Sequence, residues 1–333
     1  MKRILVTGGA GSIGRELVKF YLKDSSIICI FDNNEDGLFR LKSELYQEFP
    51  SFHHKLRYFL GDIRDQKRLI NAFKDVDIVF HCAALKHVAL CEYNPSEAVA
   101  TNIIGTQNII ESAIINDVKK VILTSSDKAV NPSSAMGASK LVAERLCISA
   151  NSLVGKGSTR FCCVRFGNVW NTNGSVGRIF RNQIKNREQI TITDKRMTRF
   201  FVDMNQAINL CKFACERMEG GETFVLDMGV AKVIDIANEI IKQNGKGEIK
   251  EIGASPGEKL YEELYTDIEG LRTVICDGIY IILPEKNNIN NCFERVLEKY
   301  KKEKKIGSAL RSDNENIKKA NIKLLINSLL RDL

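Results

Sequence analysis

The sequence predicts an α/β fold in which a doubly wound parallel sheet is followed by a smaller, mixed α/β lobe. Short apolar runs alternate with amphipathic stretches through the first half of the chain. The runs are nearly continuous in Val, Ile and Leu, which is typical of parallel strands covered on both faces. A glycine-rich turn follows the first run and opens the first amphipathic stretch, as it does in dinucleotide-binding sheets.

The first half of the chain alternates expected strands with expected helices. The strands are expected at Arg3–Thr7, Ile27–Phe31, Leu56–Leu60, Val76–His81, Lys120–Thr124 and Arg160–Phe166. The helices are expected at Arg15–Lys23, Glu35–Glu48, Gln66–Phe73, Ser96–Ile115 and 137–151. Because crossovers between parallel strands are right-handed, this order wraps helices onto both faces of one sheet.

The alternation ends after Gly167, and the second half is expected to form the mixed lobe. Helices are expected at Ile179–Lys185, Met204–Met218, Ile234–Asn244 and, shorter, Glu258–Tyr265, with a strand at Ile190–Thr193. We therefore expect a Rossmann dinucleotide-binding domain at residues 1–168, an interleaved substrate lobe at 169–285 and a basic helical tail at 286–333. The stretch Pro284–Asn291 is the expected linker into that tail.

The composition is that of an ordinary globular protein, with 44% hydrophobic and 27% charged residues among 333. No apolar run approaches the roughly 18 residues of a membrane-spanning helix, and the N-terminus becomes glycine-rich too soon for a signal peptide. We expect a cytoplasmic protein without a membrane partner. The formal net charge is +8, and from Glu294 onward 11 Lys and Arg stand against 6 Asp and Glu. This excess indicates a solvated helix face rather than a nucleic-acid surface.

The ten cysteines have the spacing of neither a disulfide set nor a metal site. Several lie within apolar runs, no Cys-x-x-Cys occurs, and the four histidines do not pair with cysteines at zinc spacing. We expect free, buried thiols in a reducing compartment and no bound metal.

The glycine-rich turn is the strongest motif of the first half. Gly8, Gly11 and Gly14 follow the first strand and open the first helix. In this pattern the first glycine permits a tight turn, the second lets the backbone approach a pyrophosphate and the third lets the helix pack on the strand. Ser12 and Ile13 lie at the helix N-terminus, whose free N–H groups attract phosphate. A purely structural turn is the alternative.

Acidic and small residues continue the predicted cofactor site along the same sheet edge. Asp32 ends the second strand, 18 residues after Gly14. An acid there hydrogen-bonds ribose hydroxyls and repels a 2′-phosphate, so NAD is favoured over NADP. Arg40 lies nearby and leaves NADP open, and a helix-capping role for Asp32 is the structural alternative. Further cofactor contacts are expected after the third and fourth strands, from Asp62, Ile63, Ala83 and Ala84.

Groups suited to acid–base chemistry follow the fifth strand. Ser126, Asp127 and Lys128 come directly after it, and the next expected helix carries Met136 and Lys140 one turn apart. Hydroxyl, carboxyl and amine groups therefore gather where this edge faces the cofactor. A surface ion pair of Asp127 with Lys128 is the structural alternative.

These motifs resemble the extended short-chain dehydrogenase/reductases, which carry Tyr-x-x-x-Lys where this chain has Met136 and Lys140. The run Ser126–Pro132 followed by Met-Gly-Ala-Ser-Lys is similar to one subgroup, the polysaccharide-biosynthesis 4,6-dehydratases of UDP-N-acetylglucosamine. Within that subgroup the members that retain C5 configuration resemble this chain in having Met. Segments 83–102, 165–169, 197–201 and 256–263 also match, so the resemblance spans about residues 3–265.

The resemblance implies a reaction in which NAD takes hydride from C4 of the sugar, water leaves across C5 and C6, and the hydride returns to C6. Lys128 is expected to take the C5 proton, with its pKa lowered by the neighbouring Lys140. Asp127 is expected to protonate the departing hydroxyl, and Ser126 to hydrogen-bond the 4-oxygen. Lys140 is expected to bind the nicotinamide ribose. Met136 cannot transfer a proton, so the role of the missing Tyr is unassigned.

The expected substrate contacts are Lys86, Asn168, Arg178, Arg199 and Glu258. The late motif of the subgroup begins Arg-Pro-Gly-Glu-Lys, and here Ser255 replaces its Arg. This departure leaves the nucleotide open between UDP and GDP, the GDP form resembling enzymes of the legionaminic-acid pathway.

Two other functions stay open on the same fold. The first is an inverting 4,6-dehydratase or a nucleotide-sugar 4-epimerase, and the second is a non-catalytic NAD-binding regulatory protein. Met136 argues against an epimerase, which depends on the Tyr, and the Asp127–Lys128 pair argues against a regulator. A homo-oligomer, dimeric or larger, is expected through the stretches Ser96–Ile115 and Met136–Asn151.

Overall fold

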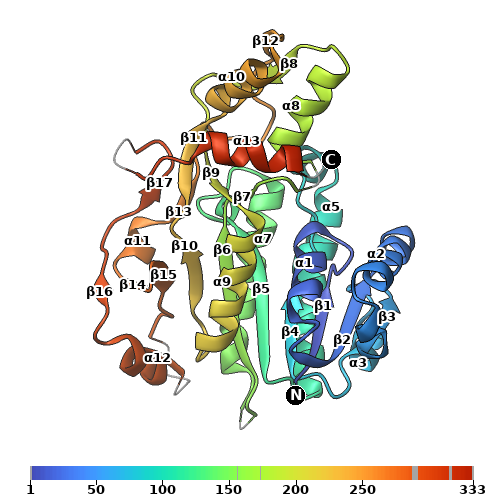
Figure 1. Cartoon of the computed structure of the whole chain (residues 1–333). Coiled ribbons are helices and arrows are strands. Elements are labelled where there is room, and N and C mark those ends of the chain that lie inside the picture. The colour runs from blue at the N-terminus through green and yellow to red at the C-terminus, as the bar shows by residue number, and fades with distance from the viewer. Residues whose placement is uncertain (1, 156, 173, 287–291, 315–316, 332–333) are drawn as a thin grey trace.

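The computed structural model describes residues 2–155, 157–172, 174–286, 292–314 and 317–331. Its centre is a ten-stranded sheet in the order β16-β14-β15-β10-β6-β5-β4-β1-β2-β3, with a smaller lobe above one end of the strands (Figure 1). The six strands from β3 to β6 in this order run parallel. This is the strand order of dinucleotide-binding sheets, so the predicted doubly wound fold is confirmed.

The parallel strands lie within two residues of their predicted ends. They are β1 (Lys2–Thr7), β2 (Ser25–Asp32), β3 (Leu56–Leu60), β4 (Ile78–His81), β5 (Lys120–Ser126) and β6 (Arg160–Phe166). The sheet continues into strands that the sequence did not predict. These are β10 (Thr223–Leu226), parallel to β6, and the antiparallel β15 (Ile279–Ile282), β14 (Thr273–Cys276) and β16 (Lys304–Lys305).

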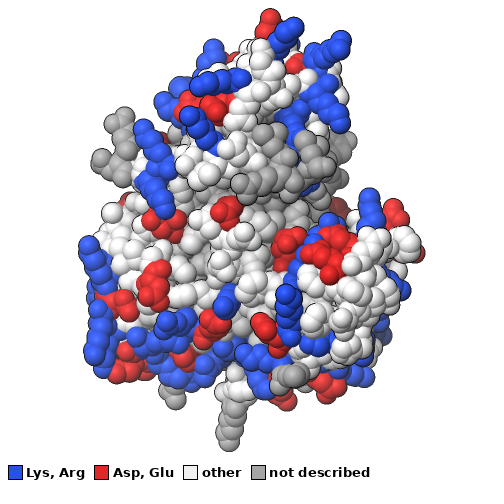
Figure 2. All heavy atoms as spheres, in the orientation of Figure 1, with Lys and Arg blue, Asp and Glu red and all other residues white. Residues whose placement is uncertain are grey.

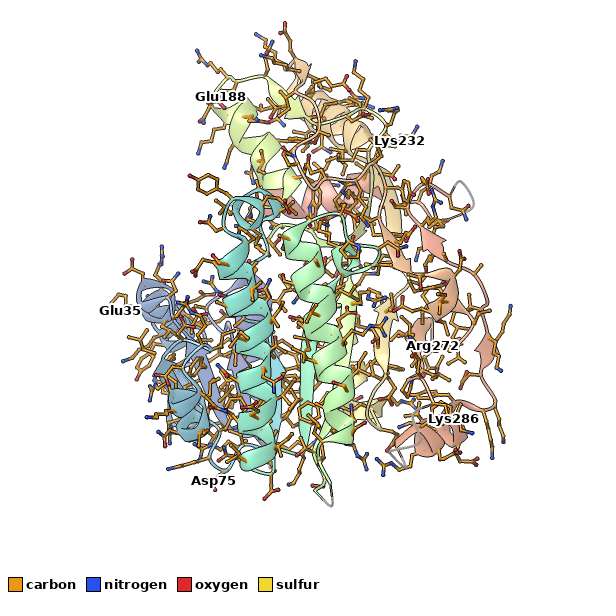
Figure 3. All side chains as sticks on the ribbon, turned by 180° about the vertical axis from the view of Figure 1, so that it is seen from behind. Glu35, Asp75, Glu188, Lys232, Arg272 and Lys286 are labelled. Atoms are coloured by element: carbon orange, nitrogen blue, oxygen red, sulfur yellow. The ribbon has the colours of Figure 1, made fainter. Side chains whose placement is uncertain are left out.

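Helices cover both faces of the sheet. Leu17 of α1 (Ser12–Tyr21), Leu41 of α2 (Glu35–Glu48) and Ile208 of α9 (Met204–Arg217) are buried in one apolar cluster. The opposite cluster contains buried side chains of α3 (Gln66–Ala72), α6 (Gly105–Ile115) and α7 (Ala135–Ser149). Figure 3 shows α6 and α7 side by side on that second face. Each cluster removes apolar surface from water, and this burial is the main stabilising term of the fold.

The stretch that was expected to be one helix from Ser96 to Ile115 contains a π-helical turn. It consists of α5 (Pro95–Ala98), the π turn η2 (Val99–Ile104) and α6. Such turns are frequent at functional sites. The turn carries the buried Asn102, whose amide bonds both backbone groups of Leu85, at 2.8 and 3.0 Å, and donates to Ser139 Oγ at 2.9 Å. Asn102 thereby fastens the loop after β4 to α7.

The smaller lobe has its own core. Its strands are β7 (Asn168–Val169), β9 (Thr198–Val202) and β11 (Gly229–Lys232), with the separate pair β8 (Ile190–Ile192) and β12 (Ile249–Glu251). Its helices are α8 (Val176–Lys185), α10 (Val233–Asn244) and α13 (Ile322–Arg331). Trp170, Phe201, Ile236 and Ile326 are buried together between them. Trp170 meets Phe201 edge to face at 5.7 Å between ring centroids.

The basic C-terminal tail packs against both parts of the molecule. Val296 and Tyr300 of α12 (Cys292–Tyr300) are buried in the core of the main sheet. Next, β16 joins the sheet edge, and Ile326 of α13 enters the core of the smaller lobe. The lysines stay exposed while the apolar residues between them reach both cores. Figure 2 shows acidic side chains interspersed with basic ones over the lower part of this face.

The prediction of a helix at Glu258–Tyr265 is wrong. A turn is followed by β13 (Glu263–Tyr265), which pairs with β17 (Leu310–Arg311) of the tail. That partner lies almost 50 residues away in the sequence, so the local pattern could not reveal it. The predicted linker at Pro284–Asn291 lies mostly outside the described residues.

A buried ion group joins the main sheet to the segment after β13. Arg165 of β6 bonds Glu144 of α7 at 2.7 Å and Glu269 of α11 (Asp267–Gly270) at 3.1 Å, and it donates to the Leu264 carbonyl at 2.8 Å. Burial by itself would raise the pKa of Glu269, but the Arg165 guanidinium outweighs burial and lowers it. Arg165 belongs to a stretch that resembles a substrate motif, yet its contacts are structural.

The cysteines are free where the structure describes their side chains. All nine of these are unpaired, and seven of them are buried. None of the described helices is both long and apolar enough to cross a bilayer.

Candidate active site

A cavity of about 1040 Å³ runs along the carboxyl ends of the parallel strands and into the smaller lobe. Its wall contains the loops that follow β1 to β6, together with residues of α8 and β9. Ligands of open α/β sheets bind at this edge. Within the described ranges, no group of three or more His, Cys, Asp or Glu side chains is placed to hold a metal ion.

The glycine-rich turn forms a cradle at one end of this cavity. Gly8 has φ +65°, and a Cβ on Gly14 would lie 2.2 Å from the Gly8 carbonyl oxygen. The turn therefore requires glycine at the first position for conformation and at the third for close packing. Gly11, Ser12 and Ile13 line the cavity at the start of α1. No side chain caps this helix end, and its first turn contains no acidic residue, so the positive end of the helix dipole at the cavity suits an anion such as pyrophosphate.

Asp32 stands where a ribose-binding acid is expected. It lines the cavity, and its two oxygens accept the backbone N–H groups of Ala10 and Asn34, each at 2.9 Å. These bonds fix the carboxylate against the glycine-rich turn and leave further lone pairs for hydroxyl donors. Arg40 does not line the cavity, and its Nε donates to the Asp36 carbonyl. The remaining predicted cofactor residues, Asp62, Ile63, Ala83, Ala84 and Lys140, all line the cavity.

The chemical groups after β5 lie at the middle of the cavity. Ser126 ends β5, and Asp127 and Lys128 form the 3-10 turn η3 (Asp127–Ala129). Ser126 Oγ donates to Asp127 Oδ1 at 2.8 Å, and Lys128 Nζ donates to the same oxygen at 3.1 Å. Ser126 and Lys128 line the cavity, whereas Asp127 is fully buried behind them and does not. A proton passing between Asp127 and a ligand would therefore travel through Ser126 or Lys128.

The expected lowering of the Lys128 pKa is wrong. Burial alone would lower it, but the carboxylates of Asp127 and Glu262 outweigh burial and raise it. Lys140 was the expected cause, yet burial lowers the pKa of Lys140 itself, and its Nζ donates to the Thr124 carbonyl at 2.6 Å. At rest Lys128 is an ammonium. Met136 lines the cavity and packs on Cys91 and Ala98. It stands where the resembling enzymes carry Tyr, and its thioether cannot transfer a proton.

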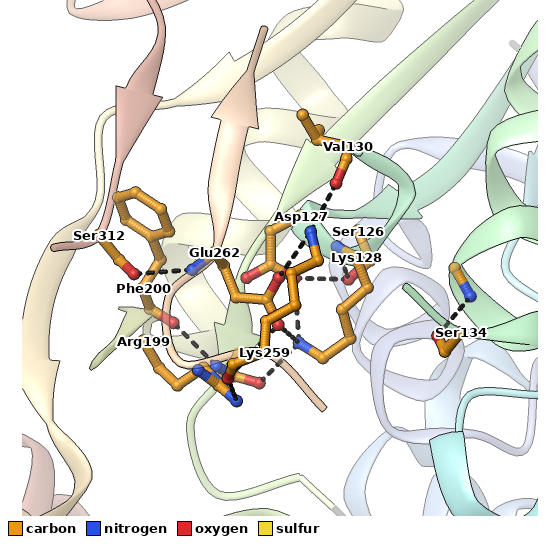
Figure 4. Close-up of polar contacts among 12 residues, drawn as sticks. Ser126, Asp127, Lys128, Val130, Ser134, Arg199, Phe200, Lys259, Glu262 and Ser312 are labelled. Atoms are coloured by element: carbon orange, nitrogen blue, oxygen red, sulfur yellow. Dashed lines mark hydrogen bonds and ion pairs between the residues drawn. The ribbon is translucent and has the colours of Figure 1, made fainter. Parts of the chain in front are cut away.

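The sequence prediction missed Glu262, which comes from the loop before β13. Its side chain is 3% exposed, lines the cavity and places Oε1 3.7 Å from Lys128 Nζ (Figure 4). Lys259 Nζ lies 3.7 Å from its Oε2, and Arg199 Nε lies 3.8 Å from Oε1. Its backbone N–H donates to Ser312 Oγ of the tail at 2.9 Å. The run Glu-Lys-Leu-Tyr-Glu-Glu contains the residue, but nothing local distinguishes it from Glu263, which bonds Asn131 instead.

The predicted substrate residues have different positions. Lys86, Asn168, Arg199 and Glu258 line the cavity. The guanidinium of Arg199 donates to the carbonyls of Thr198, Lys259 and Leu260, so it holds the loop that carries Glu262. Arg178 is not among the described residues of the cavity wall, because it lies on the exposed side of α8 next to the buried Gly177.

The fold and this cavity define a class: an extended short-chain dehydrogenase/reductase, with a glycine-rich turn and the Ser126–Asp127–Lys128 group along one sheet edge. Residues 4–284 match the family described as "Polysaccharide biosynthesis protein". The chain belongs to this family, whose relatives include nucleotide-sugar 4,6-dehydratases and epimerases.

Three relatives illustrate the range of that family. The chain is 48% identical over 301 residues to "Uncharacterized membrane protein MJ1061" of Methanocaldococcus jannaschii, covering 86% of this chain and 89% of that protein. It is 38% identical to a "UDP-N-acetylglucosamine 4,6-dehydratase (inverting)" of Campylobacter jejuni, covering 85% and 83%. It is 37% identical to a "UDP-glucose 4-epimerase" of Rickettsia bellii, covering 87% and 85%.

Solved structures share the fold. The X-ray structure of Pen from Bacillus thuringiensis superposes with a TM-score of 0.87 at 40% identity, covering 99% of this chain and 97% of that one. The dTDP-glucose 4,6-dehydratase DesIV of Streptomyces venezuelae, solved with NAD and TYD bound, has a TM-score of 0.71 at 19% identity, covering 90% and 97%. The likeness to Pen extends through the tail, beyond the end of the family match.

Proposed function

We propose that this protein is an NAD-dependent 4,6-dehydratase of a nucleotide-activated N-acetylhexosamine, with UDP-N-acetylglucosamine as the favoured substrate and the GDP sugar as the alternative. The observation that carries the proposal is the hydrogen-bonded Ser126–Asp127–Lys128 group, of which Ser126 and Lys128 line a cavity that is continuous with the dinucleotide cradle. Such a product would serve bacterial surface glycan or nonulosonic acid biosynthesis.

The residues of the cradle fit NAD. The glycine turn and the uncapped start of α1 would hold its pyrophosphate, Asp32 its adenosine ribose and Lys140 its nicotinamide ribose. The position of Arg40 away from the cavity supports NAD over NADP. Bound there, NAD supplies a hydride acceptor for C4 of the sugar that gives the hydride back at C6.

The protein's own groups supply the proton transfers. Ser126 would hydrogen-bond the 4-hydroxyl and pass its proton to the buried Asp127, which accepts from Ser126 Oγ. Asp127 would return that proton through Ser126 to the leaving C6 hydroxyl. Lys128 would take the C5 proton. This relay gives the proton of the 4-hydroxyl a route that does not need the Tyr replaced by Met136.

Met136 supports retention of configuration at C5, because the retaining members that this chain resembles carry Met. The relative from Campylobacter jejuni is named as inverting. Proton NMR coupling constants of the product therefore decide the stereochemistry: retention is expected, and inversion at C5 would overturn the assignment.

Product analysis separates the candidate functions. The purified protein is incubated with UDP-N-acetylglucosamine and, separately, with the GDP sugar, and the products are analysed by mass spectrometry. The loss of one water supports the dehydratase. An isobaric sugar would instead indicate an epimerase, which the Rickettsia relative's name makes the second candidate. Bound NAD without any product would indicate a regulatory protein.

The Lys128→Ala variant tests the acid–base centre. We expect kcat to fall by about 10²- to 10⁴-fold, the usual contribution of a general base, while NAD stays bound. Lys119→Ala is the matched control, because Lys119 is exposed and pairs with the half-buried Asp77, and neither residue lines the cavity. Full activity of Lys128→Ala would overturn the role of this amine.

We further propose that residues 1–168 hold the cofactor, that 169–285 hold the nucleotide sugar, and that the protein is a cytoplasmic homo-oligomer. Exposed apolar side chains on the π turn and α6, Val99, Ile104 and Ile115, support an interface there. The buried free thiols suit a reducing compartment.

A further inference from the structure

Lys128 cannot act as a base in the state that its surroundings favour. Its Nζ faces three oxygens: Asp127 Oδ1 at 3.1 Å, Asn168 Oδ1 at 3.4 Å and Glu262 Oε1 at 3.7 Å. An ammonium has three N–H donors and no lone pair, so this arrangement matches the protonated form. A proton acceptor must therefore remove one proton before Lys128 can attack C–H.

Asp127 is a poor candidate for that acceptor. In the proposed mechanism Asp127 receives the proton of the 4-hydroxyl through Ser126, so its carboxyl already carries a proton when the C5 proton is removed. Asn168 cannot accept a proton at its amide. The third neighbour, Glu262, has no other proton-transfer task in the cavity.

We infer that Glu262 is the proton acceptor of Lys128: its carboxylate takes one ammonium proton and leaves the free amine that removes the proton from C5. The inference rests on the proposed dehydratase function. A gap of 3.7 Å is longer than a hydrogen bond, so the transfer requires a small movement of the Lys128 side chain or one bridging water.

The position of Glu262 suits a proton store. Glu262 Oε2 is buried without a hydrogen-bond partner among the described residues, and the Lys259 ammonium lies 3.7 Å from it, beyond hydrogen-bond distance, so no donor occupies the position of a proton on this oxygen. The charged groups that face Glu262 are Asp127, Lys128, Arg199 and Lys259. Burial, and then the Asp127 charge, raise the pKa of Glu262 against the three cations. A carboxyl with a raised pKa accepts a proton from an amine more readily than an exposed one does.

Two anchors keep Glu262 in place. Ser312 Oγ accepts its backbone N–H, and Arg199 ties the preceding residues by donating to the carbonyls of Lys259 and Leu260. Lys259 Nζ donates to the Val130 carbonyl at 2.8 Å, next to η3. Ser312 and Arg199 therefore hold the loop with Glu262, and Lys259 joins that loop to the turn with Lys128 (Figure 4).

The proton steps balance. An N–H bond of Lys128 breaks and an O–H bond forms on Glu262, which neutralises both groups. After C4 is oxidised, the amine takes the C5 proton, the C5–H electron pair becomes the C5–C6 double bond and the C6–O bond breaks. The oxygen leaves as water with the proton held by Asp127. When Lys128 reprotonates C5, Glu262 returns its proton to the amine.

The test compares Glu262→Gln with the wild type, with Glu263→Gln as the matched control. Glu263 is the next residue, is also buried, at 8% exposed against 3% for Glu262, and bonds Asn131, and neither Glu263 nor Asn131 lines the cavity. At neutral pH we expect kcat of Glu262→Gln to fall by about 10- to 100-fold, below the range of a direct catalytic group, with KM little changed. Because Lys128 must then lose its proton to solvent, the remaining activity should rise with pH, by about tenfold per unit below the pKa of the amine.

A second measurement does not depend on turnover. The reactivity of Lys128 toward acetic anhydride is followed against pH by mass spectrometry of the labelled peptide. Removing the Glu262 charge removes an interaction that favours the ammonium, so Lys128 should titrate at lower pH in Glu262→Gln than in the wild type. Glu263→Gln should leave the titration unchanged.

The outcomes are distinct. If the wild type yields no dehydrated sugar, the proposed function fails whatever the variant does. If the wild type is active and Glu262→Gln loses activity equally at all pH values, with an unshifted Lys128 titration, Glu262 is only structural and the inference is overturned. Recovery with rising pH together with the shifted titration supports it.

Discussion

The two ends of the cavity are built in different ways. At the cofactor end, the turn and the acid beside it come from residues that are close in sequence: Gly8, Gly11 and Gly14 form one turn, and Asp32 closes the next strand and bonds back to Ala10. The chemical end joins Lys128 to Glu262, which comes from a loop more than 130 residues later, and to Ser312 of the tail, 50 residues further on. A local motif predicts the first end, whereas only long-range packing creates the second.

This difference predicts whether a substitution should change cofactor binding or turnover. A substitution in the glycine turn should affect cofactor binding directly, because Gly8, Gly11 and Gly14 belong to one turn at the cofactor end of the cavity. A change in a distant anchor of the chemical end should spare the cofactor and still reduce turnover. The following predictions test that contrast, beginning with the largest expected effect.

Replacing Arg165 with Met should have the largest effect on stability. The change leaves Glu144 and Glu269 buried without their cation, and breaking a buried ion group in this way costs about 3–5 kcal/mol. The free energy of unfolding is measured by urea denaturation. The segment after β13 loses its tie to the main sheet, so turnover should fall as well.

Arg160→Met is the control for Arg165→Met on the same strand. Arg160 pairs with Glu219 at 2.7 Å, the same length as the Arg165–Glu144 bond, but its side chain is 36% exposed rather than 2%. A solvent-exposed pair contributes at most about 1 kcal/mol. Equal losses in the two variants would contradict the view that burial gives Arg165 its weight.

Replacing Gly14 with Ala should damage the cofactor end alone. The new Cβ would lie 2.2 Å from the Gly8 carbonyl oxygen, and such overpacking costs about 1–3 kcal/mol. We expect a lower melting temperature and loss of NAD binding, measured by thermal denaturation and by isothermal titration calorimetry.

Gly11→Ala sharpens the same test. Its Cβ would meet one atom, the Gly8 carbonyl oxygen at 3.1 Å, and would otherwise point into open space at the cavity. This variant should keep most of its stability. Its affinity for NAD should nevertheless fall, because the new methyl group occupies the approach of the pyrophosphate. If both variants bind NAD as the wild type does, the cradle is not the cofactor site.

Replacing Ser312 with Ala should have the smallest effect. The change removes the acceptor of the Glu262 N–H and the two bonds of Ser312 Oγ with the hydroxyl and the carbonyl of Thr198, and it costs about 1–2 kcal/mol of stability. Turnover should fall several-fold, while the affinity for NAD is unchanged, because Ser312 bonds the loop with Glu262 and does not line the cavity. Asp313→Asn, which weakens an exposed pair with Arg311, should change neither quantity. A loss of NAD binding in Ser312→Ala would contradict the separation of the two ends.

The fold class and the cofactor end were predictable from the sequence because both depend on short-range order. Alternating apolar and amphipathic runs fixed the order of β1 to β6, and the strand–turn–helix context gave the glycines their meaning. The Lys128 pKa could not be predicted in this way. It depends on burial and on two carboxylates, Asp127 and Glu262. Asp127 is the neighbour in sequence, but burial and the approach of Glu262 have no local signal.

By itself, the sequence determined the doubly wound sheet, the phosphate cradle and the identity of the groups after β5, since each is encoded within a few tens of residues. Only the tertiary structure decided that Asp127 is hidden behind Ser126, that Arg165 is a structural ion and that the basic tail supports the loop with Glu262. Those outcomes depend on which distant segments share a buried, low-dielectric space. Burial and neighbouring charge set the protonation of Lys128 and Glu262 there, and neither quantity is a property of one stretch of chain.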